Sequence, residues 1–426
     1  MTAAPTRSSR GTPAVPPQPA VGPQLPVATA PAPGTDPTPV TDPAPVTDPA
    51  VGAGLAREWP LPFTVDVPLT LSVHRRGPRD PAYATDAAGG IWRTSLTPEG
   101  PGTLRVTVRR GPPSATGPPG PSGPPGPSGP PSVPDPPGVA APSVPGPLSV
   151  PGPLSVPGPL SVPGPLSAPG PLSVPGPPGV TAPGRVVGQA WGPGAAWLLD
   201  RLPGWLGFHD DRAGFTPCHP VVSDLALRYE GFRVGRSGRV FEALVPAVLE
   251  QKVVSAEAHR AWRFLLVKHG EQAPGPAPAG MRVPPAPRTW ARIPSWDWHR
   301  AGVEGVRART IITAAAVAAR LEEAADLDPA EADRRLRSLP GIGVWTSAEI
   351  RQRAMGDPDA VSVGDYHLPN AVGWTLARRK TDDAGMLELL APYDGHRYRV
   401  TRLIELGGTR PERHGPRMSV RDYRAI

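Results

Sequence analysis

The amino-acid sequence predicts a mainly α-helical protein in which a small α+β domain with an antiparallel sheet precedes the helices. From Phe215 onward, apolar residues recur with helical spacing. Between Trp59 and Arg110 they alternate with a period of two instead, as in half-buried strands. Many of the 68 Pro and 49 Gly fall in two long segments that lack the large apolar side chains of a core. We expect those segments to be disordered.

The first of these segments covers residues 1–57 and contains repeated Thr-Asp-Pro units. The second covers 111–183, where Gly-Pro-Pro and Gly-Pro-Ser triplets at 117–131 precede a Ser-Val-Pro-Gly-Pro-Leu repeat at 143–178. The triplets are too few for a stable collagen helix, and the repeat favours extended polyproline II. We predict a leader and a passive insertion, with a docking site for readers of Pro-rich motifs as the alternative for the insertion.

Residues 58–110 and 184–212 are predicted to form one β-rich N-terminal domain that the insertion interrupts. Strand patterns cover 65–73, 91–92, 104–108 and 186–190, and an amphipathic helix is expected at 195–206. Pro68 favours an edge position for the first strand, because proline cannot donate to a sheet.

A helical domain is expected over 213–426. Its predicted helices cover about 221–230, 239–252, 255–268, 307–325, 330–338, 344–355, 367–378, 384–391 and 396–407.

The charge and the cysteine content limit the class of protein. A net charge of +7 suits a polyanionic partner such as nucleic acid, although solubility alone would also explain it. The single cysteine, Cys218, excludes an intramolecular disulfide and any four-cysteine cluster. No apolar run approaches the roughly 20 residues of a membrane span, and no secretion signal is visible. We therefore expect a cytoplasmic protein with no membrane partner.

The segment 339–343 lies between two helical patterns and predicts a tight hairpin. Gly341 and Gly343 permit a positive φ and a close backbone approach, while Ile342 can fill the core between the helices. The second helix begins near Val344 and presents free N–H groups that suit a DNA phosphate. The simpler interpretation is a turn between two helices without a ligand.

A short apolar segment, 361–364, then leads to Asp365 at the expected start of the next helix. A carboxylate there is a candidate catalytic group. Helix capping is the structural alternative, because Asp is a common N-cap.

The stretch LPGIGVWTSAEI (339–350) followed by VSVGDYHL (361–368) resembles the signature of the helix-hairpin-helix (HhH-GPD) DNA glycosylase superfamily. The branch it resembles most is the bacterial DNA-3-methyladenine glycosylase II type, which has Trp where Trp345 stands and Asp-Tyr where Asp365 and Tyr366 stand. Segments 219–234 and 241–262 are similar to the helices that precede the hairpin in that branch. The resemblance covers most of 184–426.

This resemblance implies a helix-hairpin-helix glycosylase bundle that binds double-stranded DNA containing a damaged base. It implies an enzyme of base excision repair that flips an alkylated purine out of the duplex and hydrolyses its N-glycosidic bond, with Asp365 as the catalytic residue. Bifunctional relatives carry a lysine where Trp345 stands, so no AP lyase activity is expected. The resemblance implies no metal centre, no iron–sulfur cluster and no other cofactor. The one exception is a monovalent cation at the hairpin. The hairpin residues expected to bind DNA phosphate are Gly341, Ile342, Gly343, Trp345 and Thr346.

Five further residues are candidates for the base pocket or for DNA contact. Aromatic rings would stack on a flipped base, and each of them has a core position as its alternative. Gln251 would reach the minor groove. The next position often carries an apolar wedge in the family, but this sequence has Lys252 there, and a cation fills the space left by a flipped base poorly. The candidates are Tyr366, Tyr393, Trp298, Gln251 and Lys252.

Two other hypotheses stay open. One is a noncatalytic helix-hairpin-helix module that grips DNA within a repair complex, and the other is an interaction scaffold built on the Pro-rich tracts. We expect His367 to support Asp365 or the hairpin. A monomer associated with the nucleoid of a bacterium is the expected state.

Overall fold

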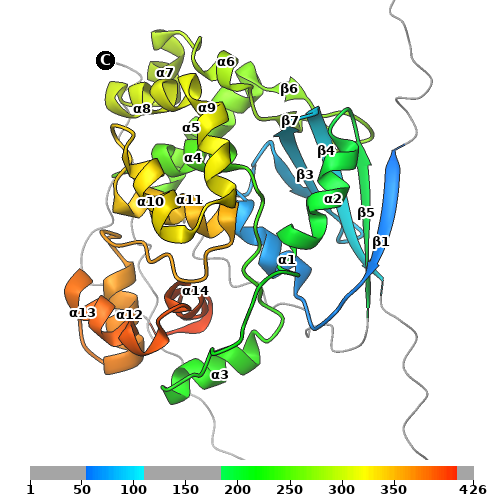
Figure 1. The fold of residues 1–426 in the computed structure, drawn as a ribbon. Coiled ribbons are helices and arrows are strands. Elements are labelled where there is room, and N and C mark those ends of the chain that lie inside the picture. The colour runs from blue at the N-terminus through cyan, green and yellow to red at the C-terminus, as the bar shows by residue number, and fades with distance from the viewer. Residues whose placement is uncertain (1–53, 110–183, 410–426) are drawn as a thin grey trace, which may run out of the picture. The chain divides into compact units, whose positions relative to one another are not determined.

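The computed structural model describes residues 54–109 and 184–409, which form an antiparallel sheet and a larger set of α-helices (Figure 1). The mainly α prediction with a preceding small sheet is therefore confirmed. The insertion expected at 111–183 lies outside the described residues, and so does the leader expected at 1–57 except for its last four residues. Those four do not continue a leader, because the first strand begins at Leu55.

The sheet has five strands in the order β1-β5-β4-β3-β2, and every neighbouring pair is antiparallel. Along β4 and β5 the register ends with Arg109 opposite Arg185, so residues 109 and 185 lie side by side. The strands are β1 (Leu55–Pro60), β2 (Tyr83–Thr85), β3 (Ile91–Thr97), β4 (Gly100–Arg109) and β5 (Arg185–Trp191).

Helix α2 (Ala195–Trp205) covers one face of this sheet. Its buried side chains Leu198 and Leu202 pack with Leu104 and Val186 of the central strands. Burial of apolar surface, worth about 25 cal/mol per Å², makes this contact stabilising for the layer.

The strand predicted at 65–73 is wrong, because these residues form the short helix α1 (Val67–Leu71) and a 3₁₀ turn (Ser72–His74). Asp66 caps the helix by accepting a 2.9 Å hydrogen bond from the amide of Leu69. Pro68 lies in the first turn, where its missing N–H costs nothing. The capping aspartate and the proline outweigh the period-two pattern.

The helices predicted after residue 215 are present in the structure, with ends shifted by a few residues. The pattern at 307–325 divides into two helices and a 3₁₀ turn (Glu323–Asp326), and the pattern at 344–355 into a helix and a π-helical turn. The helices are α3 (Pro220–Arg228), α4 (Val240–Leu249), α5 (Ser255–His269), α8 (Gly305–Ala316), α9 (Ala318–Glu322), α10 (Pro329–Arg337), α11 (Val344–Ile350), α12 (Leu368–Ala377), α13 (Asp383–Leu390) and α14 (Arg397–Gly407).

Between α5 and α8 the sequence analysis missed a small hairpin and two short helices. The hairpin pairs β6 (Glu271–Gln272) with β7 (Arg282–Val283). The helices are α6 (Pro287–Trp290) and α7 (Ser295–Ala301). Both begin after proline-containing turns, and each is too short to show a helical repeat.

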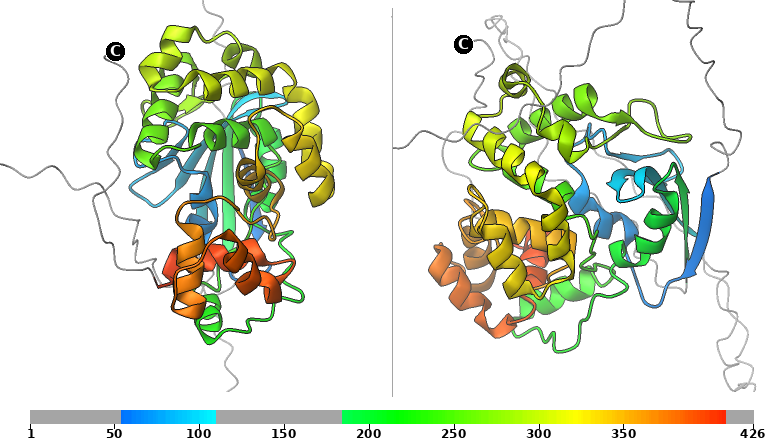
Figure 2. Two further views of the ribbon diagram at one scale, coloured as in Figure 1. Left: turned by 90° about the vertical axis from the view of Figure 1, so that its left-hand side faces the viewer. Right: turned by 45° about the horizontal axis from the view of Figure 1, so that its top comes forward.

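The helices form two separate hydrophobic cores. One surrounds α4 and includes Leu244, Ile311 and Ile342. The other joins α3 to α12, α13 and α14 through residues such as Leu225, Val372 and Leu403. Figure 2 shows α12–α14 together, apart from the helices that pack around α4. The segment that links α11 to α12 therefore passes from one core to the other.

Among the described residues, no helix combines the length and the apolar character needed to cross a bilayer.

Candidate active site

The hairpin between α10 and α11 is held by its buried isoleucine and by contact with α8. Ile342 is 5% exposed and packs in the core around α4, and its amide bonds to the carbonyl of Leu339 at 3.1 Å. Gly341 has a φ of 89°, and a Cβ built there would lie 2.1 Å from Thr310 Oγ1 on α8. Only glycine fits such a place, in both conformation and space.

Gly343 stands at the N-cap of α11 and faces open space. A Cβ built on it would meet no atom within 4 Å. Glycine has no side chain to accept hydrogen bonds from the first amides of α11, so these amides suit an external acceptor. Val344, the first residue of the helix, is 40% exposed beside it.

The side chain of Gln251, in the turn after α4, is hydrogen-bonded to the hairpin. Its Nε2 donates hydrogen bonds to the carbonyl of Gly341 at 2.9 Å and to Thr346 Oγ1 at 2.8 Å. The side chain thus ties the turn after α4 to both sides of the hairpin. Lys252 follows with a left-handed φ of 55° and is exposed to solvent.

Asp365 lies directly before α12, and both of its carboxylate oxygens have partners. Oδ1 accepts hydrogen bonds from the amides of His367 at 2.8 Å and Leu368 at 2.9 Å. Oδ2 accepts a 3.2 Å hydrogen bond from the indole Nε1 of Trp345 on α11. The structure therefore brings together the hairpin helix and the carboxylate that the sequence analysis selected. The bonds to His367 and Leu368 also order the turn before α12, whose N-cap is His367, so a structural role for the aspartate stays the alternative.

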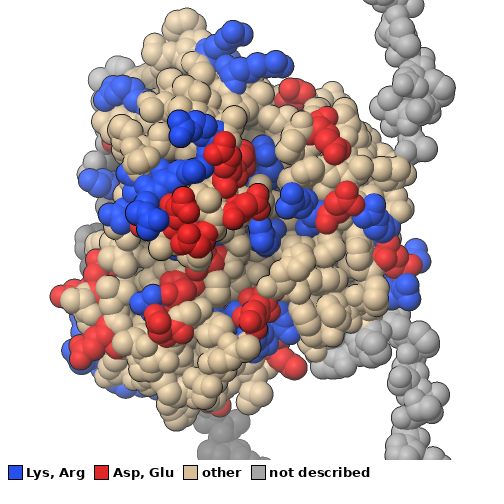
Figure 3. All heavy atoms as spheres, viewed as in Figure 1, with Lys and Arg blue, Asp and Glu red and all other residues tan. Residues whose placement is uncertain are grey.

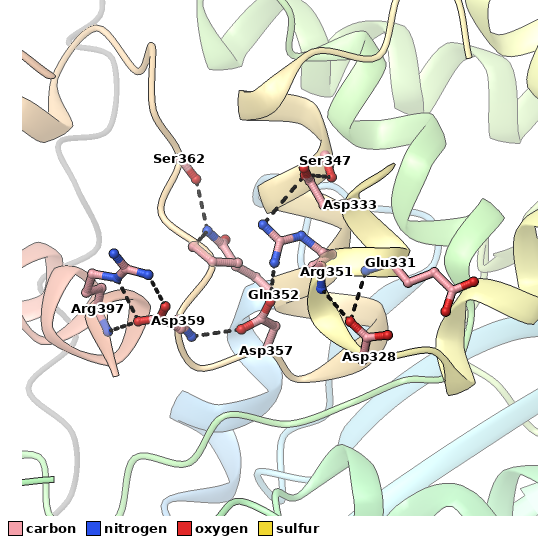
Figure 4. A network of polar contacts seen from close by, with 12 residues as sticks. Asp328, Glu331, Asp333, Ser347, Arg351, Gln352, Asp357, Asp359, Ser362 and Arg397 are labelled. Carbon is pink, nitrogen blue, oxygen red and sulfur yellow. Dashed lines mark hydrogen bonds and ion pairs between the residues drawn. The ribbon is translucent and has the colours of Figure 1, made fainter. Parts of the chain in front are cut away.

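A polar network fixes the start of the segment that carries Asp365 (Figure 4). Arg351 contacts the carboxylates of Asp357 and Asp333, and Ser347 Oγ donates to Asp333 Oδ1 at 2.7 Å. Burial alone would raise the pKa of Asp333, but hydrogen bonds from Ser347 and Arg337 outweigh it and lower that pKa. The carboxylate therefore stays charged for Arg351.

The same segment is tied to the C-terminal helices. Asp359 forms an ion pair with Arg397 at the start of α14. Closer to Asp365, the amide of Gly364 donates to the carboxylate of Asp383 on α13 at 3.1 Å. Gly364 itself has a φ of 90°, which suits glycine.

The aromatic candidates occupy different environments. Tyr366 is 86% exposed, and its ring meets that of His367 edge to face at 4.9 Å. It has a free aromatic surface beside Asp365. His367 therefore contacts Tyr366 with its ring and Asp365 with its amide.

Trp298 and Tyr393 lie in the cores, so we correct their assignment to a base pocket. Trp298 is 3% exposed and stacks on Trp290 at 5.9 Å. Tyr393 is 2% exposed and its hydroxyl lies 2.7 Å from His219 Nδ1. Neither ring has a face available for a base, because their apolar surfaces pack within the protein.

Basic side chains gather near the hairpin. The last turn of α10 carries Arg334, Arg335 and Arg337. Figure 3 shows Lys and Arg side chains over the region of α10, with acidic side chains among them. Arg335 and Arg337 pair with Glu323 and Asp333, so part of this charge is neutralised within the protein.

The sequence pattern does not reveal the polar residues that position the segment before Asp365. Gln352 is 5% exposed and bonds to Ala360 and Ser362, and Arg351 bridges two carboxylates. A glutamine or an arginine in a helix is usually solvated, so its identity alone gave no signal. Among the described residues, no group of three or more His, Cys, Asp or Glu is arranged to hold a metal ion.

Comparison with known proteins places the fold. No family model matches the chain, and no curated protein matches it in sequence. Solved structures do match: a 3-methyladenine DNA-glycosylase from Archaeoglobus fulgidus has a TM-score of 0.54 at 14% identity, covering 82% of this chain and 97% of the other. The apo 8-oxoguanine glycosylase/lyase of Clostridium acetobutylicum has a TM-score of 0.50 at 9% identity, covering 83% and 98%.

A third match, MBOgg1 in complex with a low-affinity DNA ligand, has a TM-score of 0.51 at 10% identity and covers 83% of this chain and 97% of the other. At such identities the matches show a shared fold and no more. The fold of this chain is thus that of solved DNA glycosylases.

Proposed function

We propose that this chain is a DNA glycosylase of base excision repair that hydrolyses the N-glycosidic bond of alkylated purines in double-stranded DNA. The observation that carries the proposal is the position of Asp365, whose carboxylate is bonded to the first turn of the hairpin helix through Trp345. A module that only gripped phosphate would need the hairpin and not this carboxylate.

The proposed chemistry uses the negative charge of Asp365. Breaking the bond between base and sugar leaves positive charge on the deoxyribose, and a fixed carboxylate beside C1′ stabilises that charge and orients the attacking water. Three hydrogen bonds hold the carboxylate in one orientation, so little reorganisation is needed during the reaction. An N-alkylated purine is cationic and leaves as a neutral base, so no separate general acid is required.

Duplex DNA would meet the protein at the hairpin. No described side chain at the N-cap of α11 accepts from its first amides, which suits a phosphate, and a Cβ at Gly343 would meet no described atom within 4 Å, so a strand can approach the backbone. The target nucleotide must leave the stack at a cost of a few kcal/mol. The exposed ring of Tyr366 provides a stacking surface next to Asp365 for the extruded base.

Replacing Asp365 by Asn tests the catalytic role directly. Asn keeps a side-chain oxygen that accepts the amides of His367 and Leu368, so the turn before α12 and the fold are retained. It removes the charge, and we expect the single-turnover excision rate on a methylated duplex to fall by about 10²–10³-fold. Binding to the same duplex should change by less than about threefold. Unchanged excision by the purified variant would refute the assignment and favour the noncatalytic module.

Borohydride trapping tests the expectation that the enzyme has no lyase activity. Only three lysines occur in the sequence, Lys252, Lys268 and Lys380, and Lys268 is paired with Asp297. Because Trp345 offers no amine beside Asp365, we expect abasic sites without strand cleavage and no trapped complex. A trapped complex that Lys252→Ala abolishes would show a bifunctional enzyme that uses the amine next to Gln251.

A noncatalytic helix-hairpin-helix module stays the second candidate, because Asp365 also orders the turn before α12 as a purely structural aspartate would. A panel of duplexes with single defined lesions separates the two candidates. Release of free methylated purines, detected by mass spectrometry, supports the enzyme, and binding without release of any base supports the module.

A further inference from the structure

A π-helical turn continues α11 toward the segment that carries Asp365. Residues Arg351–Met355 form this turn, and it ends at Gly356 with a φ of 68°. π-helical turns are rare within helices and occur often at functional sites. Here the turn presents Arg351 and Gln352 to the segment that leads to Asp365 (Figure 4).

Gln352 holds that segment at two points. Its Nε2 donates to the carbonyl of Ala360 at 2.8 Å and to Ser362 Oγ at 2.9 Å. Gln352 and Ser362 are each 5% exposed, so these bonds are shielded from water. Ser362 Oγ in turn donates to Glu349 Oε1 on α11 at 2.6 Å.

Ser362 passes this constraint to Asp365. The carbonyl of Ser362 accepts a 3.2 Å hydrogen bond from the amide of Asp365. Residues 357–365 belong to no helix or strand, so their path depends on hydrogen bonds to side chains together with a few backbone bonds in turns. The ion pairs at Asp357 and Asp359 act at the beginning of the segment, whereas Gln352 acts within three residues of Asp365.

We propose that Gln352 is a positioning residue, which acts through Ser362 to hold the Asp365 carboxylate against the hairpin helix. This inference rests on the proposed function of Asp365. A displacement of about 1 Å in a reacting group can cost on the order of 10²-fold in rate. The role of Gln352 would therefore appear in the rate of the chemical step and not in DNA affinity.

The test compares Gln352→Met with the wild-type full chain. Methionine matches the length of glutamine and donates no hydrogen bond. We expect the single-turnover excision rate to fall by about 10–100-fold, with the dissociation constant for the methylated duplex changed by less than about threefold. A milder second variant, Ser362→Ala, should show the same split between rate and affinity. In the double variant the loss of rate should be smaller than the two single losses multiplied, because the two residues share one hydrogen bond.

Asp359→Asn serves as the matched control. It weakens the tie of the same segment to Arg397, six residues before Asp365, and leaves Gln352 and Ser362 intact. We expect it to lower the melting temperature while the excision rate stays within about twofold. If Asp359→Asn slows excision as much as Gln352→Met does at equal loss of stability, the proposal is overturned, because both residues would then act only through folding.

A readout independent of activity separates this inference from the proposed function. The amides of His367 and Leu368 are bonded to Asp365, so their hydrogen exchange reports on its position. Gln352→Met should accelerate exchange at 361–368 and leave 339–347 unchanged. If the wild type excises no lesion, the proposed function fails, and faster exchange at 361–368 alone still supports the positioning role. Unchanged exchange in that segment overturns it.

Discussion

The two oxygens of Asp365 have different partners. Oδ1 accepts the amides of His367, the N-cap of α12, and of Leu368, its first residue, and these bonds are reason enough for an aspartate at this position. Oδ2 accepts from the indole of Trp345, which belongs to another helix, α11, and takes no part in the turn before α12. The second contact is what relates Asp365 to the hairpin.

Replacing Trp345 by Phe removes the indole N–H and keeps an aromatic ring. We expect excision to slow by about tenfold, because a hydrogen bond to a charged group is worth about 1.5–3 kcal/mol and its loss lets the carboxylate turn. Single-turnover kinetics on a methylated duplex measure the change.

Trp374→Phe is the control for this substitution. Trp374 lies on α12, and its buried indole N–H has no hydrogen-bond partner among the described residues. The control should leave the excision rate unaltered. Equal rates for Trp345→Phe and the wild type would mean that the contact with Asp365 plays no part in the reaction.

At the scale of elements, we expect substitutions of the two hairpin glycines to cause different defects. One should lower stability and the other DNA affinity. Gly341→Ala forces a Cβ onto Thr310 at a φ of 89°, so we expect a loss of about 1–3 kcal/mol in the free energy of unfolding. Gly343→Ala has open space and a negative φ, so stability should stay within about 0.5 kcal/mol. Its added methyl group would stand where a phosphate approaches, and DNA affinity should fall.

Urea unfolding and fluorescence anisotropy with an undamaged duplex measure these two effects. A Gly343→Ala variant that binds DNA as the wild type does would remove the hairpin from the proposed interface.

The elements also show how far the sequence predicts this structure. Long helices such as α5 and α14 have enough turns for their periodicity to be visible, and the hairpin and Asp365 were found by motif. The helix α1 was mistaken for a strand, because five residues show alternation as easily as helical spacing. Short local patterns are ambiguous in this way wherever a cap decides the outcome.

The site was predicted in part for a similar reason. Spacing predicts that Asp365 begins a helix, but nothing in it shows that Gln352 turns inward to meet Ser362. Trp298 and Tyr393 were chosen for their ring type, and only tertiary packing shows that both are buried.

At the scale of the whole described chain, the sheet layer is connected to the turn that positions Asp365. Arg353 belongs to the same π-helical turn as Gln352, and its Nε donates to the carbonyl of Val73 at 3.1 Å. Next to Val73, His74 lines a small pocket together with Arg76, Arg93 and Arg353. A buried polar junction thus joins the sheet side of the protein to the helix that carries Gln352.

This junction predicts a dependence of stability on pH. Burial, and then repulsion by Arg93, Arg76 and Arg353, lowers the pKa of His74 well below its usual value. The unfolded chain binds a proton near pH 6.5 and the folded chain does not. Stability is therefore complete above about pH 6.5 and decreases as the pH falls below it, by at most about 1.4 kcal/mol per pH unit from this group.

His74→Gln removes the titrating group and keeps a neutral polar side chain. Urea unfolding at pH 7.5 and pH 5.5 should show a smaller loss of stability on acidification for this variant than for the wild type. His259, whose pKa is also lowered by burial, is present in both proteins and cancels in the comparison. If both proteins lose the same stability between these two pH values, His74 is protonated as readily in the folded chain as in the unfolded one. Acidification would then not lower the stability of the folded chain through this junction.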